Sequence, residues 1–159
     1  GPGGLLTRKT PMKIFSLCFA LVLAGANLAH AQTAAAPAAA PAGLYAALGE
    51  KAGIDRLADD FVERLLRHPR IGPQFKDTKP AAFKESLAEQ FCVLSGGPCT
   101  YQGADMREVH ADLDINKGDF NALVEVLQRA MDAQGIPFSQ QNRLLALLAP
   151  MHRDIITVH

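Results

Sequence analysis

The side chain with the clearest chemical potential in this sequence is that of His110. A neutral imidazole nitrogen is a common ligand for transition metals. Met106, Val109 and Leu113 fall close to its face on a short expected helix, residues 104–112. A single histidine on an apolar helix face is more often packed in a core than bound to a metal. Spacing alone therefore leaves both interpretations of His110 open.

Other kinds of site find little support in the same region. The expected folded part has no nucleophile with a base partner in sequence reach and no paired catalytic carboxylates. Gly96 and Gly97 follow an expected helix, whereas a phosphate-binding loop follows a strand and opens a helix. Four zinc ligands at the usual spacing cannot be assembled from Cys92, Cys99 and scattered histidines. We therefore name no catalytic residue.

Cys92 and Cys99 form an even pair with a turn-forming Gly-Gly-Pro between them. A disulfide would require the turn to bring their Cα atoms to about 5.5 Å. Two buried free thiols are an equally good interpretation, and the sequence does not choose between them.

Helices are expected to position these residues. Apolar side chains recur at helical spacing and no stretch alternates with a period of two, which indicates an all-α domain. The last predicted helix contains Pro150, which should kink it locally. The expected helices cover residues 52–67, 78–94, 104–112, 116–135 and 139–158.

Residues 1–31 are typical of a leader that is removed on export. Lys13 follows Met12, residues 14–24 are almost wholly apolar, and Ala29-His30-Ala31 forms a small-residue cleavage motif. The apolar run is shorter than the roughly 20 residues of a membrane-spanning helix, although a retained anchor is the alternative. Residues 1–11 precede Met12 and are interpreted as a tag or an overlong start, and Cys18 would be lost with the leader. We expect a periplasmic or secreted protein with no stable membrane span after cleavage.

The mature chain then divides into a linker and one domain. Residues 32–43 are rich in alanine and proline and carry no charge, which predicts a semi-extended linker before a domain at 44–159. Hydrophobic residues make up 48% of the chain and charged residues 20%, enough to build a core. Residues 1–31 hold three of the 16 basic residues and none of the 16 acidic ones, so the rest has a formal charge of −3. This balance argues against nucleic acid as a partner.

Several short motifs resemble one family. The segment 96–110, GGPCTYQGADMREVH, resembles the helix end, loop and proximal-histidine segment of group I truncated haemoglobins. Residues 44–49, LYAALG, are similar to the start of that family, and Asp59-Asp60-Phe61 to its second-helix segment. Phe75 matches the phenylalanine that stacks on haem after the third helix. The resemblance runs from Leu44 to the C-terminus without an obvious gap.

The resemblance implies a truncated globin, a two-over-two helical sandwich around one b-type haem. His110 would be the proximal iron ligand, with its other nitrogen bonded to a nearby backbone carbonyl. Phe75 would pack on the porphyrin face, and Tyr101 with Lys84 or Arg107 would be candidates for a propionate contact. Plain core packing is the alternative for each of the other pocket residues it implies: Phe61, Phe91, Met106, Ile115 and Phe120.

The ligand side of the haem departs from the family. A tyrosine usually follows the phenylalanine matched by Phe61, and its hydroxyl donates a hydrogen bond to bound oxygen, but here the residue is Val62. Two further ligand-side positions fall on Phe83 and Leu87, so all three are apolar. Losing such a hydrogen bond costs about 1.5–3 kcal/mol. That is roughly a ten- to hundredfold loss of oxygen affinity.

Other side chains could compensate. Gln90 lies one turn beyond Leu87 and is a possible donor to the ligand, although a rim or surface position is the alternative. Lys84 or His68 could supply a sixth iron ligand. His152 and His159 are interpreted as surface residues.

The leading hypothesis is reversible binding of a diatomic ligand, oxygen, NO or CO, outside the cytoplasm. An apolar ligand side favours NO and CO, which need no hydrogen bond. One alternative is an NO dioxygenase or weak peroxidase, which would need an external reductase because the chain has no flavin domain. The others are a periplasmic haem or electron carrier, and a helical domain that has lost haem.

Overall fold

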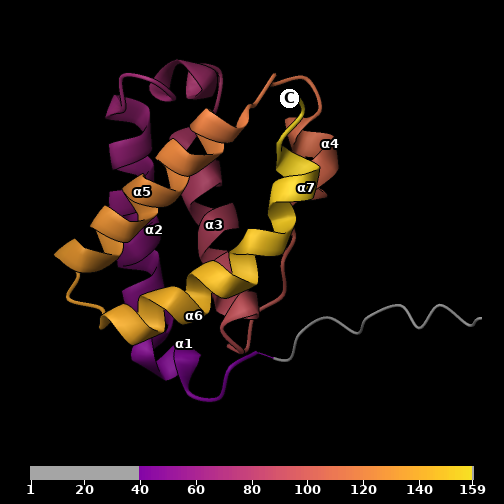
Figure 1. Ribbon diagram of the computed structural model, residues 1–159. Coiled ribbons are helices and arrows are strands. Elements are labelled where there is room, and N and C mark those ends of the chain that lie inside the picture. Colours follow the sequence, from indigo (N-terminus) through magenta and orange to yellow (C-terminus); the bar gives the residue numbers. More distant parts are fainter. Residues whose placement is uncertain (1–39, 159) are drawn as a thin grey trace, which may run out of the picture. The chain divides into compact units, whose positions relative to one another are not determined.

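The computed structural model describes residues 40–158, and this part of the chain contains helices and no strand (Figure 1). The all-α expectation is thus confirmed. The expected leader, most of the linker, Cys18 and His159 lie outside the described residues. The elements are α1 (Leu44–Ala47), α2 (Glu50–Arg67), η1 (Gly72–Phe75), α3 (Pro80–Leu94), α4 (Met106–His110), α5 (Lys117–Ala133), α6 (Phe138–Leu148), η2 (Ala149–Met151) and α7 (His152–Ile155).

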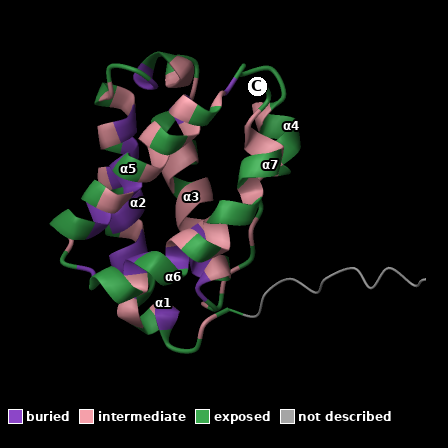
Figure 2. Cartoon of the chain, viewed as in Figure 1, coloured by how far each residue is buried: buried purple, intermediate pink, exposed green. Residues whose placement is uncertain are grey.

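Helix α2 is the centre of the core, because its apolar residues recur every three to four positions on the face turned to α3 and α5. Figure 2 shows this face as a buried stripe. The phenyl rings of Phe61 on α2 and Phe91 on α3 lie 6.2 Å apart between centroids. The buried residues of α2 are Gly53, Ile54, Leu57, Ala58, Phe61, Val62 and Leu65.

Helix α3 begins and ends at residues that cannot easily sit within a helix. Pro80 occupies its first position, where the missing N–H is not needed. Gly96 has φ +84° just after the helix, a conformation that glycine adopts without strain. The N–H of Gly97 donates to the carbonyl of Cys92 at 2.8 Å, and that of Gly96 to Val93 at 3.1 Å. These two bonds form the Schellman end that reverses the chain toward α4.

Side-chain caps define the starts of α4 and α5. The carboxylate of Asp105 accepts hydrogen bonds from the backbone N–H groups of Arg107 and Glu108. Asn116 and Asp119 form a reciprocal capping box at α5. Helix α4 is consequently shorter than expected, beginning at Met106 instead of residue 104.

The C-terminal segment differs most from the sequence prediction. The single helix expected over 139–158 is divided into α6, η2 and α7, and the chain is extended from Ile156 onward. Pro150 has no N–H to continue the helical bonding, and its ring clashes with the preceding turn. Beyond α7, the last residues bond to Ile115 instead of continuing the helix.

No helix within residues 40–158 is long and apolar enough to cross a membrane.

Candidate functional site

A largely apolar cavity of about 600 Å³ lies within the helical domain. Residues from every described helix except α1 line it, and they include five phenylalanines. No lysine or arginine is among the described residues on its wall, and His110 is the single histidine there. The phenylalanines of the lining are Phe61, Phe75, Phe83, Phe91 and Phe120.

His110 reaches this wall from the last turn of α4. Its Nδ1 lies 2.6 Å from the backbone carbonyl oxygen of Met106, one turn earlier on the same helix. A carbonyl can only accept, so Nδ1 carries the proton and donates it. The neutral ring then has its lone pair on Nε2, the tautomer that binds a metal through Nε2.

Helix α3 supplies an apolar part of the wall. Phe83 and Leu87, the ligand-side positions indicated by the sequence, both line the cavity and are half-buried. Val62 does not line it; it is fully buried inside the α2 core. The expectation that Val62 forms part of the pocket is therefore not met in this structure.

Phe75 lies on the wall as well, at the end of η1. Its ring stacks on that of Phe83, with centroids 5.3 Å apart and an interplanar angle of 21°. Phe91, Met106, Ile115 and Phe120, which the resemblance also assigned to the pocket, all line the cavity.

Gln90 lines the cavity from α3, but its amide is directed to sulfur atoms. Its Nε2 lies 3.5 Å from Sδ of Met106 and 3.6 Å from Sδ of Met151. Thioether sulfur is a weak acceptor. In this arrangement Gln90 connects α3 with α4 and η2, and its N–H groups are held only weakly.

The candidate propionate contacts are engaged elsewhere. The hydroxyl of Tyr101 donates to the carbonyl of Ala104 at 3.1 Å, and burial raises the pKa of this phenol. Lys84 lies 3.4 Å from Asp59 and 3.5 Å from Glu63, while Arg107 pairs with Asp154 at 2.8 Å. Of the three, only Tyr101 is on the cavity wall.

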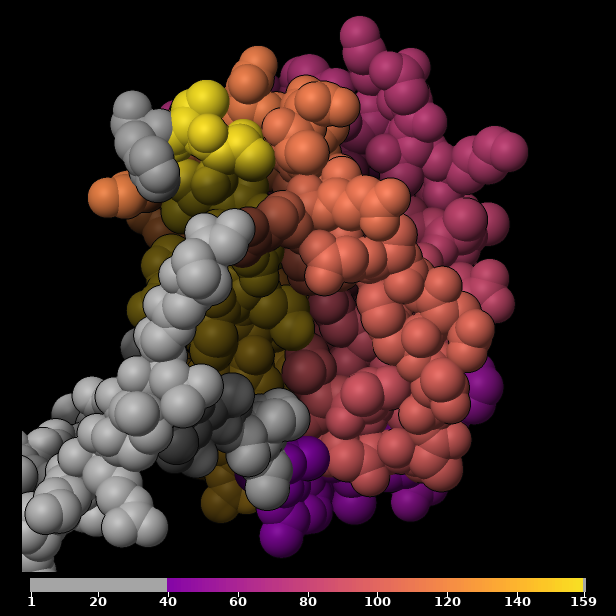
Figure 3. Space-filling model, turned by 90° about the vertical axis from the view of Figure 1, so that its right-hand side faces the viewer, coloured from indigo at the N-terminus to yellow at the C-terminus, as the bar shows by residue number. Residues whose placement is uncertain are grey.

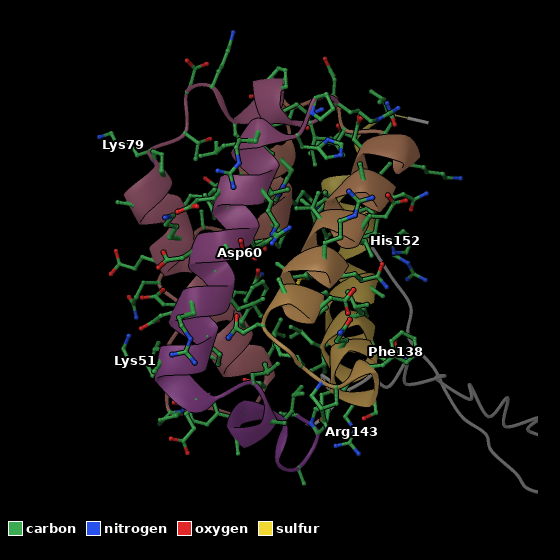
Figure 4. All side chains as sticks on the ribbon, turned by 90° about the vertical axis from the view of Figure 1, so that its left-hand side faces the viewer. Lys51, Asp60, Lys79, Phe138, Arg143 and His152 are labelled. Atoms are coloured by element: carbon green, nitrogen blue, oxygen red, sulfur yellow. A yellow bond between two sulfur atoms is a disulfide. The ribbon has the colours of Figure 1, made fainter. Side chains whose placement is uncertain are left out.

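The other two histidines of the described chain do not line the cavity, although the ring of His152 lies edge-on to that of Phe120, which does, with centroids 6.3 Å apart. Nδ1 of His68 is within hydrogen-bonding distance of the backbone N–H groups of Arg70 and Ile71. His152, labelled in Figure 4, is exposed on α7 and has Nδ1 2.9 Å from the carbonyl of Ala149. In this structure neither His68 nor Lys84 is placed to be a sixth iron ligand.

A disulfide between Cys92 and Cys99 joins the end of α3 to the loop that leads to α4. Their Cα atoms are 5.9 Å apart. A Cβ at Gly97 would lie 2.6 Å from the sulfur of Cys92 and 2.5 Å from the ring of Tyr45. Two of the motifs that carry the family resemblance, residues 44–49 and 96–110, therefore pack against each other.

The sequence analysis did not identify all of the residues that line the cavity. Helices α6 and α7 with η2 contribute apolar side chains that the sequence shows only as an amphipathic stripe. Polar groups were missed too, among them the buried carboxyl of Asp119. The backbone N–H of Asn116, and then Arg70, hold the pKa of that carboxyl below its ordinary value. The missed lining residues include Gln74, Thr78, Ser86, Asn121, Leu123, Val124, Leu145, Leu148, Met151 and Ile155.

The wall fits a large, flat, apolar group that carries a metal ion. Aromatic and aliphatic side chains supply most of the contact surface, and one imidazole of defined tautomer supplies a ligand. Haem combines these two requirements, and axial histidine ligation is its usual attachment in globins.

Comparisons with known proteins give the family. The bacterial-like globin family matches residues 43–157. A group 1 truncated haemoglobin from Mycolicibacterium paratuberculosis is 29% identical over 119 residues, which cover 75% of this chain and 88% of that protein. One from a Synechocystis species is 32% identical over 119 residues, covering 71% of this chain and 96% of that protein.

Solved structures agree on the fold. The Fe(III) form of the truncated haemoglobin from Tetrahymena pyriformis has a TM-score of 0.69 at 22% identity, covering 71% of this chain and 97% of that one. The 2/2 haemoglobin of a Synechococcus species has a TM-score of 0.66 at 23% identity, covering 72% of this chain and 97% of that one. The helices and their cavity thus define a two-over-two globin fold.

The chain belongs to the bacterial-like globin family and, within it, to the group 1 truncated haemoglobins. Haem is the cofactor of this family, and the cavity described above fits it.

Proposed function

We propose that this globin holds one b-type haem through His110 and reversibly binds a neutral diatomic ligand. The observation that carries the proposal is the position of His110. Among residues 40–158 it is the one histidine on the wall of the apolar cavity, and its Nδ1 is fixed by the carbonyl of Met106 at 2.6 Å. That bond orients the ring and raises the basicity of the nitrogen left for the metal.

The haem supplies the iron at which a diatomic ligand binds. The protein decides which ligand is favoured, chiefly through the side chains of α3. Phe83 and Leu87 on this wall offer no hydrogen-bond donor, the amide of Gln90 is directed to the sulfur atoms of Met106 and Met151, and Val62 does not line the cavity. Oxygen gains from a donor because it takes up partial negative charge when bound, whereas NO and CO depend on one less. We therefore propose that NO or CO binding is favoured relative to oxygen.

Absorption spectra test the role of His110. The protein is titrated with haem, and ferric and ferrous spectra are recorded for the wild type, His110→Ala and His152→Ala. His152 is the matched control because its Nδ1 also lies near a backbone carbonyl, yet its side chain is off the cavity wall. We expect the globin-type Soret band to be lost in His110→Ala and retained in His152→Ala. An unchanged spectrum in His110→Ala would overturn the assignment.

Stopped-flow measurement of oxygen release tests the ligand preference. The ferrous oxygen-bound protein is mixed with CO, and the rate of replacement gives oxygen dissociation. We expect release roughly ten- to hundredfold faster than from relatives that carry a tyrosine donor, from the 1.5–3 kcal/mol of one hydrogen bond. Release as slow as in those relatives would contradict the proposal.

We further propose that the protein works outside the cytoplasm. The motif in residues 12–31 supports export, and the disulfide is of a kind that persists in oxidising compartments. A fusion of residues 12–43 to a reporter that is active only after export checks this. Activity is expected for the fusion and not for one in which Lys13 and the apolar run are deleted. Equal activity of the two fusions would count against export.

A further inference from the structure

The helix that carries His110 turns its apolar face to the cavity. Met106, Val109 and His110 of α4, and Leu113 just beyond it, all line the cavity. The contacts that hold α4 against the rest of the protein are therefore made on its other side.

The C-terminal segment lies directly beside it. Helix α7 runs along α4 (Figure 1), and the space-filling view shows the last residues against those that follow α4 (Figure 3). Nη2 of Arg107 on α4 lies 2.8 Å from Oδ1 of Asp154 on α7. This ion pair joins the first turn of α4 to the C-terminal segment.

A second contact is made just beyond α4. The carbonyl of Ile115 accepts hydrogen bonds from the backbone N–H groups of Thr157 at 2.9 Å and Val158 at 3.1 Å. The N–H of Ile115 donates to Oγ1 of Thr157 at 2.9 Å. Ile115 is buried and lines the cavity, so these three bonds fix the wall where the chain leaves α4.

We propose that Asp154 and Thr157 are positioning residues for His110. They act through Arg107 and Ile115, and neither of them lines the cavity. The C-terminal segment 152–158 thereby holds α4 from the outside and sets the position of the imidazole toward the haem. This inference rests on the proposed function, because it assigns the segment a role in haem ligation by His110.

The test uses the full-length haem-loaded protein with Thr157→Val, Asp154→Asn and a chain that ends at Ile155. Thr100→Val and Asp112→Asn are matched controls, since both residues are exposed and lie in the same 95–116 region. Two quantities are measured: the iron–histidine stretching band of the ferrous protein by resonance Raman, and the rate of haem transfer to excess apomyoglobin.

We expect the Raman band to shift or broaden in Thr157→Val and in the shortened chain. Haem transfer should accelerate about three- to tenfold in Thr157→Val, as for the loss of one hydrogen bond. It should change by at most about fivefold in Asp154→Asn, because its ion pair is exposed. The controls should match the wild type.

A role in stability alone would lower the melting temperature without moving the Raman band, and that result would overturn the proposal. If the shortened chain fails to fold, Thr157→Val decides. If His110→Ala still shows the iron–histidine band at its wild-type position, the proposed function is refuted. If that band is lost in His110→Ala but is unchanged in every C-terminal variant, only this inference is refuted.

Discussion

The α2–α3 side of the cavity and the segment 95–116 place their functional side chains in different ways. On the first side, Phe83 and Leu87 stand on a helix packed against the buried stripe of α2. In the second, His110 stands on a helix of five residues that is held by a cap, a disulfide and the C-terminal segment. One wall is positioned by many apolar contacts and the other by a few discrete bonds.

This contrast predicts where the molecule tolerates change. A packed wall loses much stability when a buried side chain is removed, since the cavity left behind cannot close fully. A wall held by discrete bonds loses little stability with each hydrogen bond or exposed ion pair, but the ligand geometry at His110 should respond.

The largest effect is expected for Leu57→Ala, which removes a fully buried side chain beneath the α3 wall. The free energy of unfolding should fall by about 2–5 kcal/mol. Urea unfolding followed by circular dichroism measures it. Val93→Ala, at a 39% exposed position on α3, is the control and should stay within about 0.5 kcal/mol. A Leu57→Ala protein as stable as this control would show that α2 is not the centre of the core.

Removing the disulfide tests the other wall. The double variant Cys92→Ser, Cys99→Ser should lower the free energy of unfolding by about 2–3 kcal/mol, because a short loop is no longer closed in the unfolded chain. A reducing agent should lower the free energy of unfolding of the wild type by the same amount and leave that of the variant unchanged. Haem transfer to apomyoglobin should also accelerate in the variant. Equal stability with and without reductant would mean that this link does not hold the segment.

The apolar surface that Phe83 and Leu87 present to the cavity can be altered by Leu87→Gln. An amide at this cavity-lining position supplies a donor, so oxygen release should slow by roughly ten- to hundredfold. Stopped-flow replacement of oxygen by CO measures the change. Val93→Gln puts the same amide on an exposed position of α3 and should leave the rate unaltered. An unaltered rate in Leu87→Gln would show that Leu87 does not face the bound ligand.

The smallest expected effect is on the pH dependence of the free energy of unfolding. The pKa of Asp119 is below its ordinary value of 3.8, first because the backbone N–H of Asn116 donates to its carboxylate and then because Arg70 does. A lowered pKa in the folded state contributes stability that is complete above the unfolded pKa and lost as pH falls through the folded one.

Asp119→Asn removes that contribution. Its stability deficit relative to the wild type should be constant from pH 7 to about pH 5 and shrink below the ordinary pKa of 3.8. Urea midpoints at several pH values give the comparison. A deficit that grows on acidification would mean that the sign of the shift is wrong.

Sequence patterns predicted the packed side of this molecule well. Apolar residues at helical spacing located α2, α3 and α5 because those helices bury one continuous face. The end of α3 at Gly-Gly-Pro and the start of α5 at Asn116 could likewise be predicted from the sequence, since helix caps have local sequence signatures.

The segment 95–116, which is held by discrete bonds, was much less predictable. His110 stood out only through family resemblance, because α4 has five residues and is too short for a periodic pattern to mark its inward face. The bonds from Thr157 to Ile115 join residues 42 positions apart and leave no periodic signal. The break of the last helix around Pro150 was expected only as a kink, since sequence does not show that Ile115 binds the residues beyond it.

The contact between Tyr45 and Gly97 also sets a practical limit on the smallest fragment that can fold. The Tyr45 ring covers Gly97 beside the disulfide, and the N–H of Tyr45 donates to the carbonyl of Ser95 at 3.1 Å. A recombinant fragment that starts at residue 46 would leave the end of α3 uncovered. A folding fragment should therefore retain the first turn of α1.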